Sequence, residues 1–137
     1  MSNKLKIEDT CLTVEQSKEL QSLGIEMKDT LMVFCDYYDQ VHDYELCINW
    51  KGATDYVFEA VPTLTNTEML EIIPQNINVC GRSFMFEIDH YSERYFVTYN
   101  CYVGEPDIIE TYVSRDAVLL RDSLFEMLKY LKTNKLM

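Results

Sequence analysis

The sequence lacks the features that mark several large classes of protein. Its 137 residues include only four glycines and three prolines, with no biased tract and no visible repeat, which argues against a disordered or solenoid protein. No apolar run approaches the length of a membrane span, and the first residues, MSNKLKIEDTC, lack the apolar core of a signal peptide. We therefore expect a single cytoplasmic domain over residues 1–137, with no membrane partner.

Motifs typical of catalytic and metal sites are also missing. The sequence contains no C-x-x-C, H-E-x-x-H or EF-hand pattern, no glycine-rich phosphate loop and no G-x-S-x-G motif. The five cysteines are an odd number with irregular spacing, and without an export signal they indicate reduced thiols in a cytoplasmic protein. We expect no cofactor, and the sequence does not favour an enzyme.

Basic residues are scarce. Twelve lysines and arginines stand against 23 acidic residues, which gives a net charge of −11. Nucleic acids and anionic membranes need a cationic surface, so neither is expected as a direct partner. An acidic surface is compatible with a basic protein partner. The sequence leaves the oligomeric state open.

The strongest local pattern predicts an antiparallel meander over residues 82–113. A four-residue loop at 89–92 would pair Phe86 with Tyr95, and a second turn at 104–108 would pair Tyr99 with Val113. One face of the meander would then be apolar and buried. Its members would be Phe84, Phe86, Tyr95, Val97, Tyr99, Cys101, Val103, Ile109 and Val113. Ser114 is a plausible N-cap of a helix that runs to about residue 133 and covers this face.

The first half of the chain predicts two short helices and a second hairpin. Capping boxes at Thr13–Gln16 and Thr65–Glu68 begin helices that end at Gly24 and before Pro74. Residues 31–35 and 45–50 predict the two strands of a second hairpin, and residues 56–61 predict a third short strand or an extended segment. The predicted fold is α+β: an antiparallel sheet of five or six strands, the C-terminal helix packed on it, and two short helices.

This layout resembles a known group of proteins. The segments LT-x-EQ-x-x-x-L-x-x-LG at 12–24, P-T-x-T-x-x-E-M-L-E-I-I-P at 62–74 and the helix ending M-L-x-x-L within 119–131 carry the resemblance. The order is similar to that of small uncharacterised proteins of gut anaerobic bacteria and their mobile elements. That group has no established activity, so the resemblance implies a layout and no functional residues.

An acidic segment rich in aromatic residues is the predicted interaction site. Residues 31–60 contain one basic and six acidic side chains, a net charge of −5, together with four tyrosines and the only tryptophan. Buried aromatic anchors ringed by charge are typical of protein interfaces. The alternative is a solvated loop with Trp50 in the core. The predicted interaction residues are Asp36, Tyr37, Tyr38, Asp39, Asp43, Tyr44 and Trp50.

Two other functions stay open. A small metal-dependent enzyme could use Asp36, Asp39, His42 and Asp43 as ligands, and a Cys/His enzyme could combine a thiol with His42 or His90. Alternatively, the dense carboxylates could mimic a nucleic acid and occupy the basic cleft of another protein. A non-enzymatic interaction or accessory protein is the favoured function.

Overall fold

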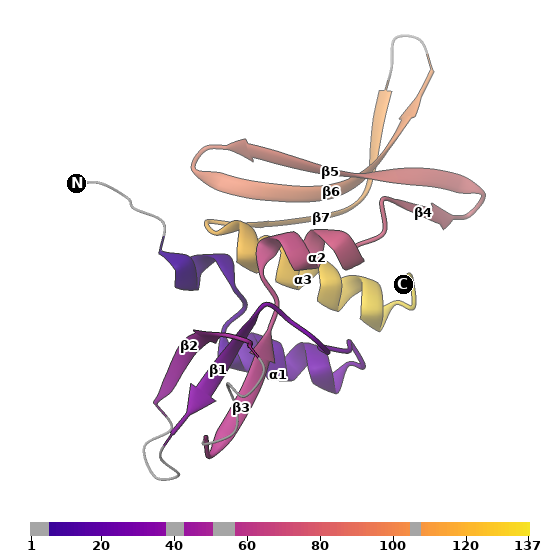
Figure 1. The fold of residues 1–137 in the computed structure, drawn as a ribbon. Helices are drawn as coiled ribbons and strands as arrows, with labels where there is room; N and C mark the ends of the chain where they lie inside the picture. Colours follow the sequence, from indigo (N-terminus) through magenta and orange to yellow (C-terminus); the bar gives the residue numbers. More distant parts are fainter. Residues whose placement is uncertain (1–5, 38–42, 51–56, 105–107) are drawn as a thin grey trace. The chain divides into compact units, whose positions relative to one another are not determined.

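The chain has an α+β fold built from antiparallel sheets. The computed structural model describes residues 6–37, 43–50, 57–104 and 108–137 (Figure 1). The chain divides into two compact units, Met1–Met69 and Leu70–Met137, and the boundary falls within α2 (Asn66–Ile72). Each unit has its own sheet, so two sheets replace the single sheet of five or six strands that we expected. That the whole chain forms one domain stays a prediction.

The first unit contains a three-stranded sheet and α1. After the 3-10 helix η1 (Ile7–Thr10) come α1 (Val14–Ser22), β1 (Met32–Asp36), β2 (Tyr44–Ile48) and β3 (Glu59–Thr63). The strand order is β2-β1-β3, with both pairings antiparallel. Figure 1 shows α1 beside β3. The predicted hairpin and third strand are thus confirmed.

Both predicted capping boxes are present. The Gln16 amide donates to Thr13 Oγ1 at 3.1 Å, and the Gln16 side chain accepts from the Thr13 amide at 3.0 Å. Thr65 and Glu68 make the same reciprocal pair at 3.2 and 2.9 Å. These contacts satisfy amides that have no partner inside the helix. Helix α1 ends before Gly24, whose φ of 94° suits glycine.

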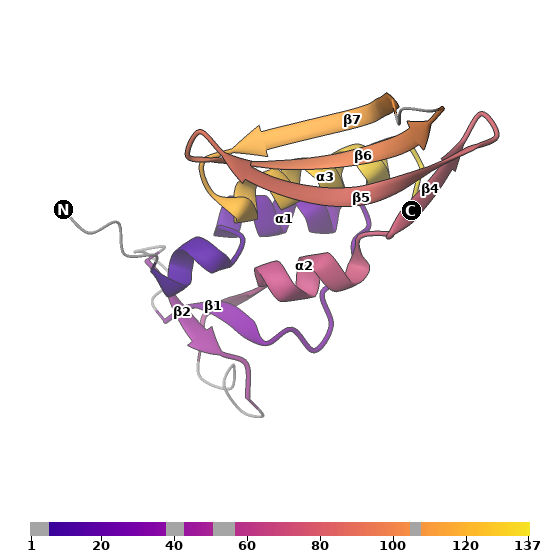
Figure 2. The ribbon, with the colours of Figure 1, turned by 90° about the horizontal axis from the view of Figure 1, so that it is seen from above.

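The second unit is a meander covered by one helix. Its elements are β4 (Asn76–Val79), β5 (Arg82–Tyr91), β6 (Arg94–Val103), β7 (Ile108–Ala117) and α3 (Leu120–Thr133). The strands lie in the sheet in chain order, β4-β5-β6-β7, and α3 lies across one face (Figure 2). We expected residues 75–81, which include β4, to be a link into the meander without a strand. Strand β4 forms because Cys80 and Gly81 both adopt positive φ, at 52° and 77°, in a tight turn.

The predicted pairing of β5 with β6 is wrong by four residues. Phe86 lies opposite Tyr99 and not Tyr95, because both strands continue to a two-residue turn that Tyr91 and Arg94 close. Ser92 and Glu93 form this turn at φ of 51° and 61°, although neither is the glycine or asparagine that such turns favour. Since the shift is an even number, every side chain keeps the face that we predicted for it.

The pairing of β6 with β7 is correct only in part. Tyr99 lies opposite Val113 as predicted, but a bulge follows, and Val103 lies opposite Ile108 and not Ile109. An extra residue in one strand reverses the faces beyond it. Ile109 is therefore exposed instead of buried. The other predicted inward-facing residues are buried or half-buried.

The C-terminal helix covers the sheet as predicted but begins later. Strand β7 continues to Ala117, so Ser114 is a strand residue and not the N-cap. Leu124, Met127, Leu128 and Leu131 of α3 are fully buried. Ser123 Oγ donates to the Tyr95 carbonyl at 2.8 Å and fixes the first turn of α3 on β6. The apolar stripe, and not the cap, positions this helix.

Candidate interaction surface on the β1–β2 hairpin

The predicted interaction residues do not all lie on the surface. The Asp36 side chain is fully buried, so it belongs to the interior of the first unit. Tyr37 and Asp43 are exposed, and Tyr44 is half-buried. Tyr38, Asp39 and His42 lie outside the described residues. A prediction from charge and loop composition could not detect that β1 extends to include Asp36.

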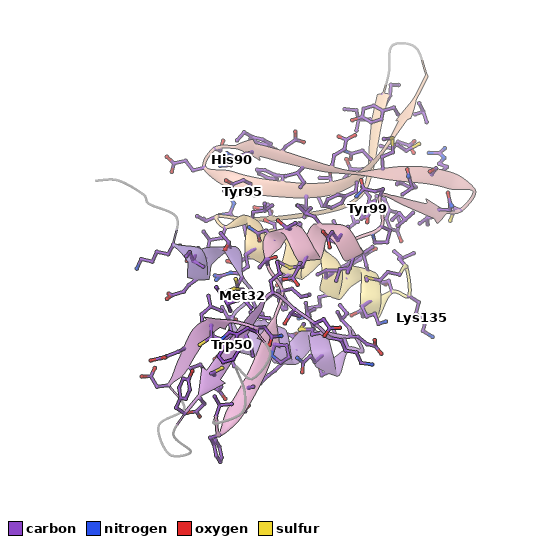
Figure 3. All side chains as sticks on the ribbon, viewed as in Figure 1. Met32, Trp50, His90, Tyr95, Tyr99 and Lys135 are labelled. Carbon is purple, nitrogen blue, oxygen red and sulfur yellow. The ribbon has the colours of Figure 1, made fainter. Side chains whose placement is uncertain are left out.

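Trp50 is exposed, with 63% of its surface accessible. This finding contradicts the alternative that places Trp50 in the core. Figure 3 shows Trp50 on the sheet of the first unit, where β2 ends. The Trp50 amide donates to the Ile48 carbonyl at 3.0 Å, so the chain turns sharply after β2. A large apolar ring held at the surface is typical of a contact site.

Two further exposed aliphatic residues lie near the end of β2, and neither was predicted as a site residue. Leu31 is 60% exposed and Ile48 is 68% exposed. The Asn49 amide donates to the Leu31 carbonyl at 2.9 Å, so Leu31 lies opposite Asn49. Paired residues share a face and successive strand residues alternate, so the Leu31 side chain lies on the face of the sheet opposite to that of Ile48. We call Ile48 and Trp50 the Trp50 patch. Strand patterns alone predict both aliphatic residues to be buried, so the sequence holds no signal for their exposure.

Polar contacts fix the backbone beneath the patch. The Leu31 amide donates to Glu68 Oε2 at 3.1 Å, and Asn49 Nδ2 donates to the Thr30 carbonyl at 2.9 Å. Thr30 Oγ1 donates to the Met32 carbonyl at 2.9 Å. The exposed side chains therefore stand on an ordered framework, which lowers the entropy lost on binding.

Of the acidic residues near β2, one is paired with a lysine and two are exposed. Lys18 of α1 lies 3.2 Å from Glu59 Oε1 and 3.4 Å from the Tyr44 hydroxyl, and its Nζ lies 5.5 Å from the centre of the Tyr44 ring. The hydrogen bond with Glu59 raises the pKa of Lys18 above its ordinary value. Asp43 and Glu45 are exposed on β2 and beside it. The edge next to the Trp50 patch is thus acidic.

The buried thiol of Cys35 is poorly suited to catalysis. Cys35 is fully buried, and burial raises its pKa to about 11. The Tyr37 hydroxyl lies 3.7 Å from Cys47 Sγ, and this hydrogen bond raises the pKa of Tyr37 to about 12. The thiolate is the reactive form of cysteine, so Cys35 is protonated and inert near neutral pH. Cys80, in contrast, is exposed in the β4–β5 turn.

The second histidine has a structural contact. His90 stacks on Tyr95 with ring centres 4.0 Å apart and planes 9° apart, which Figure 3 shows at one end of the β5–β6 hairpin. Within the described ranges, no group of three or more histidine, cysteine, aspartate or glutamate side chains could hold a metal ion. Asp39 and His42 are not among those residues, so the predicted metal-binding loop stays a prediction.

Comparisons with known proteins do not assign this chain to a family. No helix in the described part of the chain is long and apolar enough to cross a membrane. Comparisons with protein-family models, with curated proteins and with solved structures each found no significant match.

Proposed function

We propose that this protein is a non-enzymatic interaction protein that binds a basic protein partner through the Trp50 patch. The exposure of Trp50 and of Ile48, two residues before it at the end of β2, is the observation that carries the proposal. Aromatic residues contribute most strongly to binding when they become buried in an interface. The net charge of −5 over residues 31–60 favours a partner of opposite sign.

The cellular setting is part of the same proposal. The five cysteines are thiols outside any disulfide, which suits a reducing compartment such as the cytoplasm. The resemblance to proteins of gut anaerobes and their mobile elements supports an accessory or regulatory role. An acidic nucleic-acid mimic is the second candidate, supported by the overall charge of −11. A metal-dependent enzyme that uses residues 36–43 is the third.

Affinity capture from the native host tests the proposal. Wild-type protein is compared with Trp50→Ala, and Tyr91→Ala serves as a matched control because Tyr91 is 58% exposed and lies in the second unit. We expect a partner that Trp50→Ala loses and Tyr91→Ala retains. Retention of every partner by a folded Trp50→Ala variant would contradict the proposal.

The fluorescence of the only tryptophan provides a direct second readout. Trp50 is the sole residue of its kind in the chain, so its emission reports on the patch alone. In the free protein we expect emission typical of a solvated indole and strong quenching by acrylamide. Addition of the captured partner should shift the emission to shorter wavelength, because binding removes water from the ring. An unchanged spectrum at saturating partner would argue against the patch as the interface.

A further inference from the structure

In the part of the chain that the structure describes, the two sheets have four edge strands, and three of them are protected against pairing with another chain. Strand β3 contains Pro62, β4 has only four residues, and β7 carries the bulge at Tyr112 together with the charged Arg115. Proline, short length, bulges and charges are the means by which proteins prevent pairing at an exposed edge. Strand β2 is one residue longer than β4 and carries the charged Glu45, but it has no bulge, no proline and no basic residue.

The backbone of β2 can be oriented from one hydrogen bond. The Asn49 amide donates to the Leu31 carbonyl of the neighbouring chain segment. Backbone groups of successive strand residues point alternately to the two sides, and the register of β1 with β2 is regular. Glu45 and Cys47 therefore direct their amides and carbonyls toward β1. Tyr44, Leu46 and Ile48 direct theirs away from β1, to the edge with which no described strand pairs.

The opposite edge of the same sheet confirms this orientation. The Phe58 amide donates to the Asp36 carbonyl at 2.7 Å, so the backbone of Asp36 points toward β3. Because successive residues alternate, the backbone N–H and C=O of Val33 point toward β2. Pro62 lies opposite Val33 and thus occupies an outward-facing position on β3. Its missing N–H removes a donor from that edge, whereas β2 retains all of its outward donors.

The side chains of β2 define the chemistry of a strand that could pair with it. Leu46 and Ile48 lie on one face, and Ile48 belongs to the Trp50 patch. Glu45 lies on the other face and is exposed. A strand placed beside β2 would meet apolar side chains on the first face and a carboxylate on the second. Alternating apolar and basic residues complement this arrangement.

We propose that β2 is a docking edge, to which an extended segment of the partner with alternating basic and apolar residues adds as a fourth strand. The inference rests on the proposed function and specifies how the partner binds. Main-chain hydrogen bonds to Tyr44, Leu46 and Ile48 supply affinity, and contacts with Ile48 and Glu45 supply specificity. A second copy of the chain is less suitable because it would bring two acidic units together.

Amide hydrogen exchange, followed by NMR, tests the docking mode on the unmodified protein. The probe is a short synthetic peptide in which lysine and valine alternate, and the control peptide has glutamate in place of lysine. We expect the lysine peptide to slow exchange at Tyr44, Leu46 and Ile48. The amides of Glu45 and Cys47 already face β1 and should change little. The glutamate peptide should have no effect.

Two proline variants test the edge independently. Ile48→Pro removes an outward-facing donor, whereas Ile48→Ala removes the side chain and keeps the donor. Ala60→Pro is the matched control, because Ala60 occupies an outward-facing position on the opposite edge. We expect Ile48→Pro to weaken binding of the lysine peptide about tenfold or more and to abolish protection at Leu46. Ile48→Ala should retain that protection, and Ala60→Pro should bind like wild type.

The outcomes separate this inference from the proposed function. If Trp50 emission shifts with the captured partner but the outward amides of β2 stay unprotected, strand addition is wrong and the interaction function stands. If the lysine peptide does not bind, or binds without this alternation of protection, the docking edge is also overturned. Protection of the same amides in the free protein, with sedimentation showing a dimer, would identify a second copy as the occupant and contradict the inference.

Discussion

At the scale of single residues, the buried thiol of Cys35 links pH to stability. Its folded-state pKa of about 11 lies above the ordinary value of 9.0. The unfolded chain therefore releases this proton at lower pH than the folded chain does. The stabilisation is complete below about pH 9 and is lost as pH rises toward 11. Tyr37 and Tyr99, whose pKa values are also raised, act in the same direction at higher pH.

We predict that Cys35→Ala makes stability less sensitive to alkali. In urea unfolding of wild type, the free energy of unfolding should fall between about pH 9 and 11. The variant should show a smaller fall, because it lacks the thiol proton of Cys35. Cys80→Ala is the control, because Cys80 is exposed. The prediction is wrong if the Cys35→Ala and Cys80→Ala variants have parallel pH profiles.

At the scale of the elements, the β5–β6 turn is a point of strain. Ser92 and Glu93 both adopt positive φ, which costs a residue with a side chain roughly 1–2 kcal/mol. We predict that Glu93→Gly raises the free energy of unfolding by about 0.5–1 kcal/mol, because glycine adopts positive φ without strain. The greater flexibility of glycine in the unfolded chain offsets part of this gain. Glu93→Ala removes the same carboxylate and keeps the strain, so it should give no comparable gain. Equal effects of the two substitutions in urea unfolding would refute this account.

The helix α3 should be the main source of stability in the second unit. Leu124 of α3 is fully buried. We predict that Leu124→Ala lowers the free energy of unfolding by roughly 2–5 kcal/mol, because it removes buried methyl groups and leaves a cavity. Glu126→Ala, on the exposed face of the same helix, should cost less than about 0.5 kcal/mol. Similar losses for both variants in denaturant titrations would contradict the packing of α3.

Elements with signals in the local sequence were predictable. The capping boxes at Thr13 and Thr65 and the apolar stripe of α3 each identify one helix, and the structure contains all three. Strand registers were less predictable, because Ser92 and Glu93 carry no turn signal and nothing in the sequence marks the bulge at Tyr112. The exposure of Leu31 and Ile48 depends on what packs beside them, which a strand pattern does not encode.

At the scale of the whole molecule, the net charge of −11 affects the rate at which a charged partner associates with the protein. We predict that binding of the lysine–valine peptide weakens as salt rises, mainly through slower association, since ions screen the attraction between separated charges. Stopped-flow fluorescence of Trp50 measures both rate constants. A dissociation rate that carries all of the salt dependence would contradict long-range attraction. Replacing Glu45 by Gln should reduce the salt dependence, and replacing Glu126 by Gln, in the second unit, should leave it almost unchanged.

The order of the strands has a consequence for how quickly the chain acquires its structure. In the second unit each strand pairs with its neighbour in the sequence, and the helix follows directly. In the first unit β1 must also find β3, from which β2 and two connecting segments separate it. Contacts between distant residues slow folding, because a long loop must close before they form. Residues 70–137, although synthesised last, should therefore be the faster half of the chain to fold.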